Sequence, residues 1–302
     1  MAVDRETLLG WTFPDVHQTY SDRDTILYAL GLGVGADPLD PAQLRFVYED
    51  GLRALPTMGV ILGYPGFWLR DPRTGADWTR LLHGEQSIEM FGPLPASGSV
   101  IGRTRVTDVV DKGAGKGALV YTEREIVDAA SGAVLCQQAS TTFLRGDGGF
   151  SGGSPHSGPP HSGSPARPPH PIPDRPADQE VSFKTLPQAA LIYRLSGDVN
   201  PLHADPAVAR AGGFDRPILH GLCTFGIAGY AVLSGMAGGD PDRFRSIATR
   251  FTAPVYPGET IVTELWEQDD GVVAFRSRVP ERGVVALNNG RAVLRAAKTV
   301  SA

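Results

Sequence analysis

The sequence predicts an α+β fold in which antiparallel sheets wrap around a central helix. Residues 222–237 are apolar on almost every side, which is typical of a helix buried by its surroundings. Four strand-like segments separated by turn residues follow this run, and three more close the first half of the chain. A Pro/Gly/Ser-rich tract lies between these two halves, so we expect two domains of similar plan.

The first half begins with a predicted helix. Ser21 can cap a helix that runs through residues 25–30, and the glycines of the GLGVG run that follows can end it. Residues 44–48 have the composition of a strand. Residues 56–63 fit either a strand or the start of a buried helix, because the period of so short an apolar run does not separate the two.

An antiparallel meander is predicted for the end of the first half. The alternating segments 99–110, 118–127 and 133–144 are joined by turn residues at 111–113 and 130–132. The composition then changes abruptly to Gly, Pro and Ser, with too few apolar side chains to offset the entropy of ordering. The predicted organisation is therefore an N-terminal domain at 1–146, a linker at 147–177 and a C-terminal domain at 178–302.

The second half is expected to be organised around its apolar helix. A strand at 181–185 and a helix at 187–195 precede it. Gly226 and Gly229 lie within the apolar helix and would permit a sheet to approach closely. A long buried helix followed by an antiparallel meander is the plan of a hot-dog domain, and the predicted strands of this meander are 244–251, 260–267, 272–279 and 284–295.

A turn-rich loop before this helix carries an acid and an imidazole. Gly197 and Pro201 are turn formers, so Asp198, Asn200 and His203 lie on a loop and not on a helix face. A carboxylate and a histidine five residues apart on a constrained loop can face one small volume. Such a pair is suited to moving a proton on and off a water molecule.

This run resembles the hydratase 2 signature of the MaoC-like family, the R-specific 2-enoyl-CoA hydratases. The resemblance extends over both halves and so implies a tandem double hot-dog. The N-terminal half lacks the Gly-Asp-x-Asn-Pro-x-His loop, and would be a degenerate copy whose central helix is shortened to admit a bulky acyl chain. The matching positions are Tyr193, Leu195, Ser196, Gly197, Asp198, Asn200, Pro201, Leu202, His203, His220 and Gly221.

The resemblance implies a site for adding water to the double bond of an enoyl thioester. Asp198 and His203 would hold the water and share the proton transfers, with the two half-steps unassigned, and Asn200 would orient the water or the pair. Gly221 would start the buried helix and donate its N–H to the thioester oxygen, and it leaves room for the thioester.

Three further residues are predicted to bind substrate. Tyr193 and His220 would frame the pocket, although a structural role at the helix start is the favoured interpretation of His220. The net charge of -5 gives no general attraction for the phosphates of coenzyme A, so nearby arginines must meet them. Arg276 and Arg278 are candidates, and the one selected as a binding residue is Arg250. Its alternative role is that of an outward-facing strand residue. The His-Gly-Glu-Gln run at 83–86 resembles a stretch of the family's N-terminal halves and would shape the acyl pocket.

The expected activity is a reversible hydro-lyase that needs no metal or redox cofactor. The GLGVG run follows a helix and not a strand, so it fails as a dinucleotide-binding fingerprint. Two alternatives remain at this point, a hot-dog thioesterase and a non-catalytic subunit that binds acyl thioesters. The acidic charge argues against nucleic acid or membranes as partners, and a tandem repeat is compatible with either a monomer or a homodimer. With no signal peptide or peroxisomal address expected, the predicted location is cytoplasmic.

Overall fold

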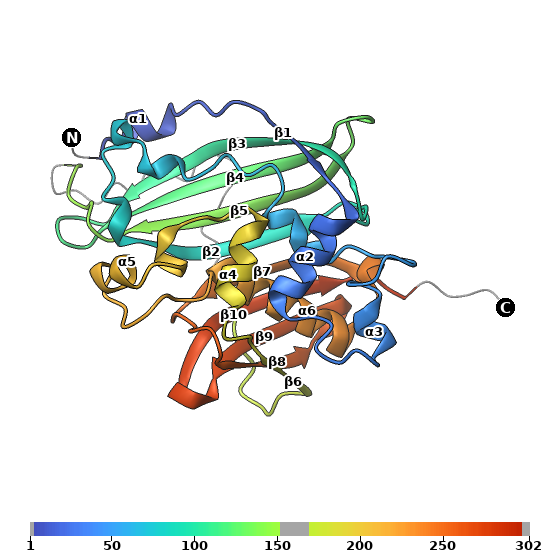
Figure 1. Cartoon of the computed structure of the whole chain (residues 1–302). Helices are drawn as coiled ribbons and strands as arrows, with labels where there is room; N and C mark the ends of the chain where they lie inside the picture. Colours follow the sequence, from blue (N-terminus) through green and yellow to red (C-terminus); the bar gives the residue numbers. More distant parts are fainter. Residues whose placement is uncertain (1–2, 152–168, 298–302) are drawn as a thin grey trace.

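Ten antiparallel strands form one continuous sheet in the described residues of the computed structural model, which are 3–151 and 169–297 (Figure 1). The strands of the first half are β1 (Val16–Tyr20), β2 (Leu81–Met90), β3 (Gly98–Asp111), β4 (Ala118–Asp128) and β5 (Val134–Leu144). Those of the second half are β6 (Gln179–Lys184), β7 (Phe244–Phe251), β8 (Thr260–Glu267), β9 (Val272–Val279) and β10 (Val284–Leu294).

The two halves of this sheet have the same strand order. From its outer edge the first half runs β1-β3-β4-β5-β2, and the second runs β6-β8-β9-β10-β7. They meet where β2 pairs with β7, in a register that extends from Glu85 opposite Arg250 to Glu89 opposite Ser246. The predicted double arrangement is confirmed, with the two expected sheets joined into one.

The central helix of the second half is α6 (Gly221–Met236), and its middle eleven residues are all buried. A Cβ atom on Gly226 would lie 2.7 Å from Leu32, and one on Gly229 would lie 2.4 Å from Thr57. These glycines therefore allow residues of the N-terminal half to pack closely against α6. The prediction that they allow the sheet to approach is wrong. The other helices are α1 (Arg5–Leu9), α2 (Asp22–Leu32), α3 (Pro41–Leu44), α4 (Ala189–Tyr193) and α5 (Pro206–Ala211).

The N-terminal half has a short 3-10 helix, Pro56–Val60, at the chain position that α6 occupies in the second half. This five-residue helix contacts both β2 and α6. The shortened central helix that the family resemblance implied is therefore present. The strand predicted at 44–48 is wrong, because α3 and a series of turns occupy that region.

Local sequence signals account for the ends of several elements. The Asp24 carboxylate accepts hydrogen bonds from the N–H and hydroxyl groups of Ser21, which fixes the start of α2 as predicted. Gly33 ends the helix with φ 97°, a left-handed conformation that glycine adopts at little cost. Asp205 caps α5 by accepting from the N–H of Ala207.

The core is shared between the two halves. Tyr28 and Met58 from the first half belong to the same buried cluster as Phe225, Val232 and Phe275 from the second. Each such side chain contributes about 1.5–3 kcal/mol through burial, so neither half keeps its core without the other. In the described part of the chain, no helix has the length and apolar character needed to cross a membrane.

The predicted linker is attached to the sheet on both sides of residues 152–168, which lie outside the described residues. Before this gap, the Asp111 carboxylate accepts from the N–H groups of Gly149 and Ser151. After it, Asn289 on β10 donates to the carbonyl of His170. The described ends of the linker therefore pack on the two halves that it joins.

Candidate active site

A cavity of about 500 Å³ lies between the two halves, at the point where the loop after α4 meets the start of α6. This volume is typical of a site that binds a small molecule. Its lining includes five of the seven site residues predicted from the sequence, namely Tyr193, Asp198, Asn200, His203 and Gly221.

A chain of turns fixes the acid at the cavity. Gly197 has φ 118° and ends the 3-10 helix that follows α4, and its conformation redirects the chain into the loop. The Asp198 carboxylate accepts from the N–H of Asn200 at 3.1 Å. The side-chain oxygen of Asn200 accepts from the N–H of Leu202 at 3.0 Å and so starts the next 3-10 helix. The sequence Gly-Asp-x-Asn-Pro thus holds the carboxylate on a rigid turn.

His203 presents one unprotonated nitrogen to this region. Its Nδ1 donates to the carbonyl oxygen of Ile218 at 2.8 Å. Because a carbonyl only accepts, the proton of the neutral ring lies on Nδ1 and Nε2 keeps its lone pair. Burial lowers the pKa of His203 below its ordinary value of 6.5, although the nearby Asp198 opposes that shift. A neutral imidazole with a free Nε2 can accept a proton.

His220 lies behind this pair and not in the cavity lining. Its ring stacks on that of His203, with centroids 3.7 Å apart and planes 28° apart. Its Nε2 donates to the backbone carbonyl of Asp198 at 3.1 Å. Burial and the neighbouring His203 lower the pKa of His220 to about 3, so the ring is neutral. The geometry gives His220 a supporting position, in agreement with the structural role favoured for it and not with direct substrate contact.

The N–H of Gly221 points out of the first turn of α6. None of the described residues accepts a hydrogen bond from it, as expected for the first residue of a helix. The positive end of the helix dipole adds to its attraction for a negatively charged oxygen. A Cβ atom at this position would lie 3.2 Å from the ring of Phe251, which lines the same cavity, so a side chain here would crowd that ring.

Among the described residues, Asp198, His203 and His220 form a group that could hold a metal ion. One ligand atom from each lies within 4.8 Å of the other two. The two imidazole rings are nearly parallel, however, and their in-plane lone pairs do not converge on one point as the ligands of a tetrahedral ion must. The arrangement is better suited to binding a water molecule than a metal ion.

The other two predicted binding residues have different surroundings. The Tyr193 hydroxyl is buried and has no hydrogen-bond partner within the described residues, and its ring lies 5.0 Å from that of His220. Arg250 is not part of the cavity lining. Its Nη2 and Nε atoms bond to Glu85 Oε1 at 2.6 and 2.9 Å, which ties β7 to β2. The structure therefore does not bring Arg250 to the other site residues.

Several cavity residues were not singled out from the sequence. They belong mainly to the inner face of the N-terminal sheet, and the signal that could have revealed them is the period of two along each strand. His83 and Gln86 are exceptions, since the His-Gly-Glu-Gln run was expected to shape the acyl pocket and both residues line the cavity. The residues that were missed include Tyr64, Thr104, Arg124 and Gln138.

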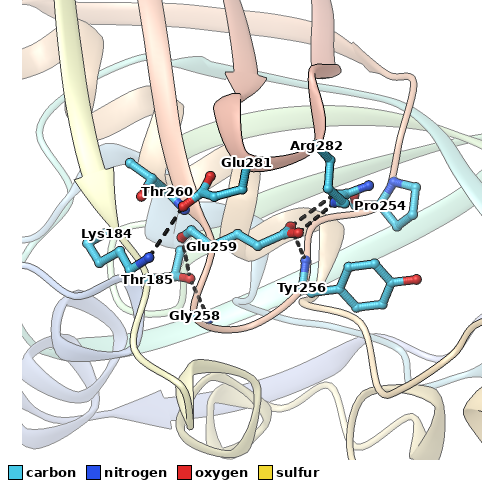
Figure 2. A network of polar contacts seen from close by, with 9 residues as sticks. All are labelled: Lys184, Thr185, Pro254, Tyr256, Gly258, Glu259, Thr260, Glu281 and Arg282. Atoms are coloured by element: carbon cyan, nitrogen blue, oxygen red, sulfur yellow. Dashed lines mark hydrogen bonds and ion pairs between the residues drawn. The ribbon is translucent and has the colours of Figure 1, made fainter.

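A network of charged side chains supports the rim of the cavity at residues 253–255 (Figure 2). The buried Glu259 accepts from the N–H of Tyr256 at 2.8 Å and pairs with Arg282, whose Nε lies 2.5 Å from Oε1. Arg282 also donates to the carbonyl of Pro254. Since the N–H of Leu219 donates to the carbonyl of Val255 at 2.7 Å, the rim in turn holds the segment that leads to α6.

Comparisons with known proteins cover both halves of the chain. The MaoC like domain matches residues 169–289, and the MFE-2 hydratase 2 N-terminal domain matches residues 18–146. The chain is 39% identical over 289 residues to the enoyl-CoA hydratase 2, peroxisomal, of Arabidopsis thaliana, with 93% of each chain covered. It is 40% identical over 285 residues to the 3-hydroxyacyl-thioester dehydratase Y of Mycobacterium tuberculosis, with 92% of each covered.

Solved structures show the same architecture. The MaoC-like dehydratase from Phytophthora capsici superposes with a TM-score of 0.79 at 35% identity, covering 97% of this chain and 99% of that one. A protein of Mycobacterium tuberculosis described as a double hotdog fold superposes with a TM-score of 0.55. At 16% identity it bears on the fold alone, with 94% of this chain and 97% of the other covered.

Proposed function

Since the chain belongs to the MaoC-like hydratase 2 family, we propose that it catalyses the reversible R-specific hydration of trans-2-enoyl-CoA to (3R)-3-hydroxyacyl-CoA. One observation supports this above the others. An acid, a neutral imidazole and a free backbone amide, from Asp198, His203 and Gly221, line one cavity. These are the groups that an addition of water across a conjugated thioester requires.

In the proposed reaction, Asp198 and His203 bind one water molecule next to C3 of the substrate. The pair takes one proton from the water while the hydroxide adds to C3, and it delivers one proton to C2. The protein ends with the protons it started with, and the thioester stays intact. The free Nε2 of neutral His203 supports its part as the group that accepts the proton from water. Asn200 is proposed to orient the water through its side-chain amide, whose oxygen already caps the following turn.

The proposed role of Gly221 is to stabilise the charge that develops on the thioester oxygen. Hydroxide addition at C3 pushes electrons through C2 onto this oxygen and gives an enolate-like state. The hydrogen bond from a preorganised N–H at the positive end of a helix is stronger in that state than in the ground state, and so it lowers the activation barrier. Tyr193 is proposed to border the thioester, because it lines the same cavity.

The test uses a short and a long trans-2-enoyl-CoA, with the absorbance of the conjugated enoyl group followed over time. Hydration removes this absorbance, releases no thiol and gives a product of R configuration by chiral analysis. Release of free thiol would identify a thioesterase, and binding without any chemical change would identify a non-catalytic subunit. Either result would refute the proposal.

Variants assign the residues in the same assay. Asp198→Asn and His203→Ala are each expected to lower turnover at least about a hundredfold, the scale for a positioned acid or base. The exposed Asp215 on the same segment provides a matched control, and Asp215→Asn should keep wild-type turnover. Near-normal rates for either active-site variant would show that the pair is misassigned.

We propose that no metal or redox cofactor takes part, and that coenzyme A enters only as part of the substrate. A cytoplasmic location is proposed from the sequence, whereas the names of several relatives include the word peroxisomal. Fluorescence microscopy of the tagged full chain tests the location. Light scattering coupled to size exclusion tests whether the chain, which pairs two halves internally, is a monomer or a homodimer.

A further inference from the structure

The wall of the cavity opposite the Asp198 loop is polar, which is unusual for a pocket that receives an acyl chain. It is formed by the inner face of the N-terminal sheet and includes Thr104 on β3, Arg124 on β4, and Gln138 on β5. In the sheet register Thr104 lies opposite Arg124, and Arg124 lies opposite Gln138. These three side chains are therefore direct neighbours on one face.

Arg124 is a buried cation without a counter-ion. Its side chain is 9% exposed, and it forms none of the ion pairs found among the described residues. Its Nη2 donates to the carbonyl of Val60 at 2.6 Å and to Gln138 Oε1 at 2.9 Å, whereas its buried Nε has no hydrogen-bond partner in the described part of the chain. Burial lowers the pKa of the guanidinium group to about 10, so it stays charged at neutral pH.

Other polar side chains lie beside Arg124 on this wall, and one of them also lacks a hydrogen-bond partner within the described residues. The Thr104 hydroxyl is buried and unpaired among the described residues. Thr122 and Ser140 bond to each other at 2.7 Å, and the Gln138 amide donates to the carbonyl of Gly59 at 2.9 Å. Buried polar groups in native proteins are normally paired, and an unpaired buried charge is costly. Arg124 and Thr104 thus form an incomplete polar site.

The cavity connects this site to the reacting atoms. Asp198, Gly221, Thr104 and Arg124 line the same volume. The guanidinium carbon of Arg124 lies 5.4 Å from the centroid of the Tyr64 ring, and Tyr64 lines the same cavity as Asp198. With the thioester oxygen placed at Gly221 and C3 at the Asp198 pair, Arg124 is one of the cavity groups left for the part of the acyl chain beyond C3.

We propose, on the basis of the proposed hydratase function, that the preferred substrate carries a carboxylate on the acyl chain beyond C3. This group binds Arg124 and the hydroxyl of Thr104. A planar guanidinium group matches a carboxylate with two parallel hydrogen bonds, and the Nε that lacks a partner is one of the donors for such a pair. The substrate class is an ω-carboxy-2-enoyl thioester. It differs from an ordinary enoyl thioester in that its acyl chain ends in a carboxylate and not in a methyl group.

The experiment compares trans-2-enoyl-CoA substrates that end in a methyl group with ω-carboxy substrates of the same carbon number, over a series of lengths. We expect kcat/KM to favour the carboxylate at one length by at least about thirtyfold, the lower end of the effect of removing one partner of a buried charge pair. Arg124→Met should abolish this preference, mainly through KM, and improve turnover of the methyl-terminated substrate. Arg124→Lys should restore part of the preference, because a lysine keeps the charge and loses the paired donors.

Two further variants keep the test decisive. Thr104→Val keeps the shape of the wall and should lower the preference about tenfold, which tests the site even if Arg124→Met does not fold. Arg105→Met is the matched control, because Arg105 follows Thr104 on β3, is 69% exposed and pairs with Glu123 on the opposite face. It should leave the preference unchanged.

The outcomes separate this inference from the proposed function. A protein that hydrates methyl-terminated substrates better at every length, with a ratio insensitive to Arg124→Met, would overturn the inference and keep the hydratase function. If the protein hydrates no enoyl-CoA, the dissociation constants of saturated acyl-CoA and ω-carboxyacyl-CoA still test the site. Tighter binding of the carboxylated ligand that is lost in Arg124→Met supports the site, and equal binding overturns it.

Discussion

Replacing Gly221 by alanine should separate catalysis from stability in this protein. The residue is the first of α6, and its N–H has no acceptor within the described part of the chain. The added methyl group would lie against the Phe251 ring, which lines the same cavity, and we expect it to crowd the thioester that is proposed to bind there. Loss of one such donor lowers kcat about 10²–10³-fold, which corresponds to about 3–4 kcal/mol of barrier height. We therefore expect kcat/KM of Gly221→Ala to fall at least about a hundredfold.

The stability of the same variant should change little. The new Cβ atom would lie 3.2 and 3.4 Å from two atoms of the Phe251 ring, so the ring must move by a few tenths of an ångström. Alanine favours a helix over glycine by up to about 1 kcal/mol, which offsets this crowding. The melting temperature should therefore stay within about 3 °C of the wild type.

The assay pairs steady-state hydration kinetics with thermal unfolding. The double variant Gly221→Ala, Phe251→Leu relieves the contact with the ring, and should not recover turnover. Wild-type kcat/KM in Gly221→Ala would refute the reasoning, because the amide would then not need the open space. A large loss of stability that Phe251→Leu reverses together with activity would refute it equally, since the glycine would then serve packing alone.

Three further outcomes are expected. Burial lowers the pKa of His83 to about 4 and that of His220 to about 3. In the unfolded chain both histidines take up protons as the pH falls below about 6.5, whereas in the folded protein they stay neutral. The free energy of unfolding should therefore decrease between about pH 6.5 and pH 4, which urea titrations at several pH values would measure. Glu259→Gln should destabilise the fold by about 1–3 kcal/mol, because it weakens the partly buried ion pair with Arg282. Glu281→Gln, on the exposed side of the same network (Figure 2), is the control and should have little effect in the same urea titration. Dialysis against a chelator should leave hydration rates unchanged, and a loss restored by added zinc would contradict the interpretation of Asp198, His203 and His220 as a water site.

The catalytic loop could be predicted from the sequence because its geometry is local. Gly197, Asp198 and Asn200 are brought into position by hydrogen bonds between residues two apart, which turn-forming residue types make recognisable. The buried helix was equally accessible, because its residues are apolar on almost every side.

Features that depend on contacts distant in sequence were not predicted. The strand expected at 44–48 failed because Asp40 caps a helix by accepting from the N–H of Ala42, and the apolar Phe46 is buried after that helix and not in a sheet. Arg250 was assigned to substrate because its pairing with Glu85, 165 residues away, joins two halves whose mutual arrangement the sequence does not give. Arg124 was overlooked because alternation gives the two faces of a strand and does not say which one faces a cavity.

The proposed proton-transfer residues and the proposed acyl-binding residues lie in different halves of the chain, and this has an evolutionary consequence. In a homodimer of single hot-dog chains, one gene encodes both subunits. A substitution in the cavity wall of one subunit would therefore also be present in the subunit that supplies the acid and the imidazole. Here Asp198 and His203 are encoded in one half, while Thr104 and Arg124 are encoded in the other. If these residues have the proposed roles, a mutation can change which acyl groups are accepted and leave the residues of proton transfer unchanged. After gene duplication, one reaction could then be adapted to many substrates.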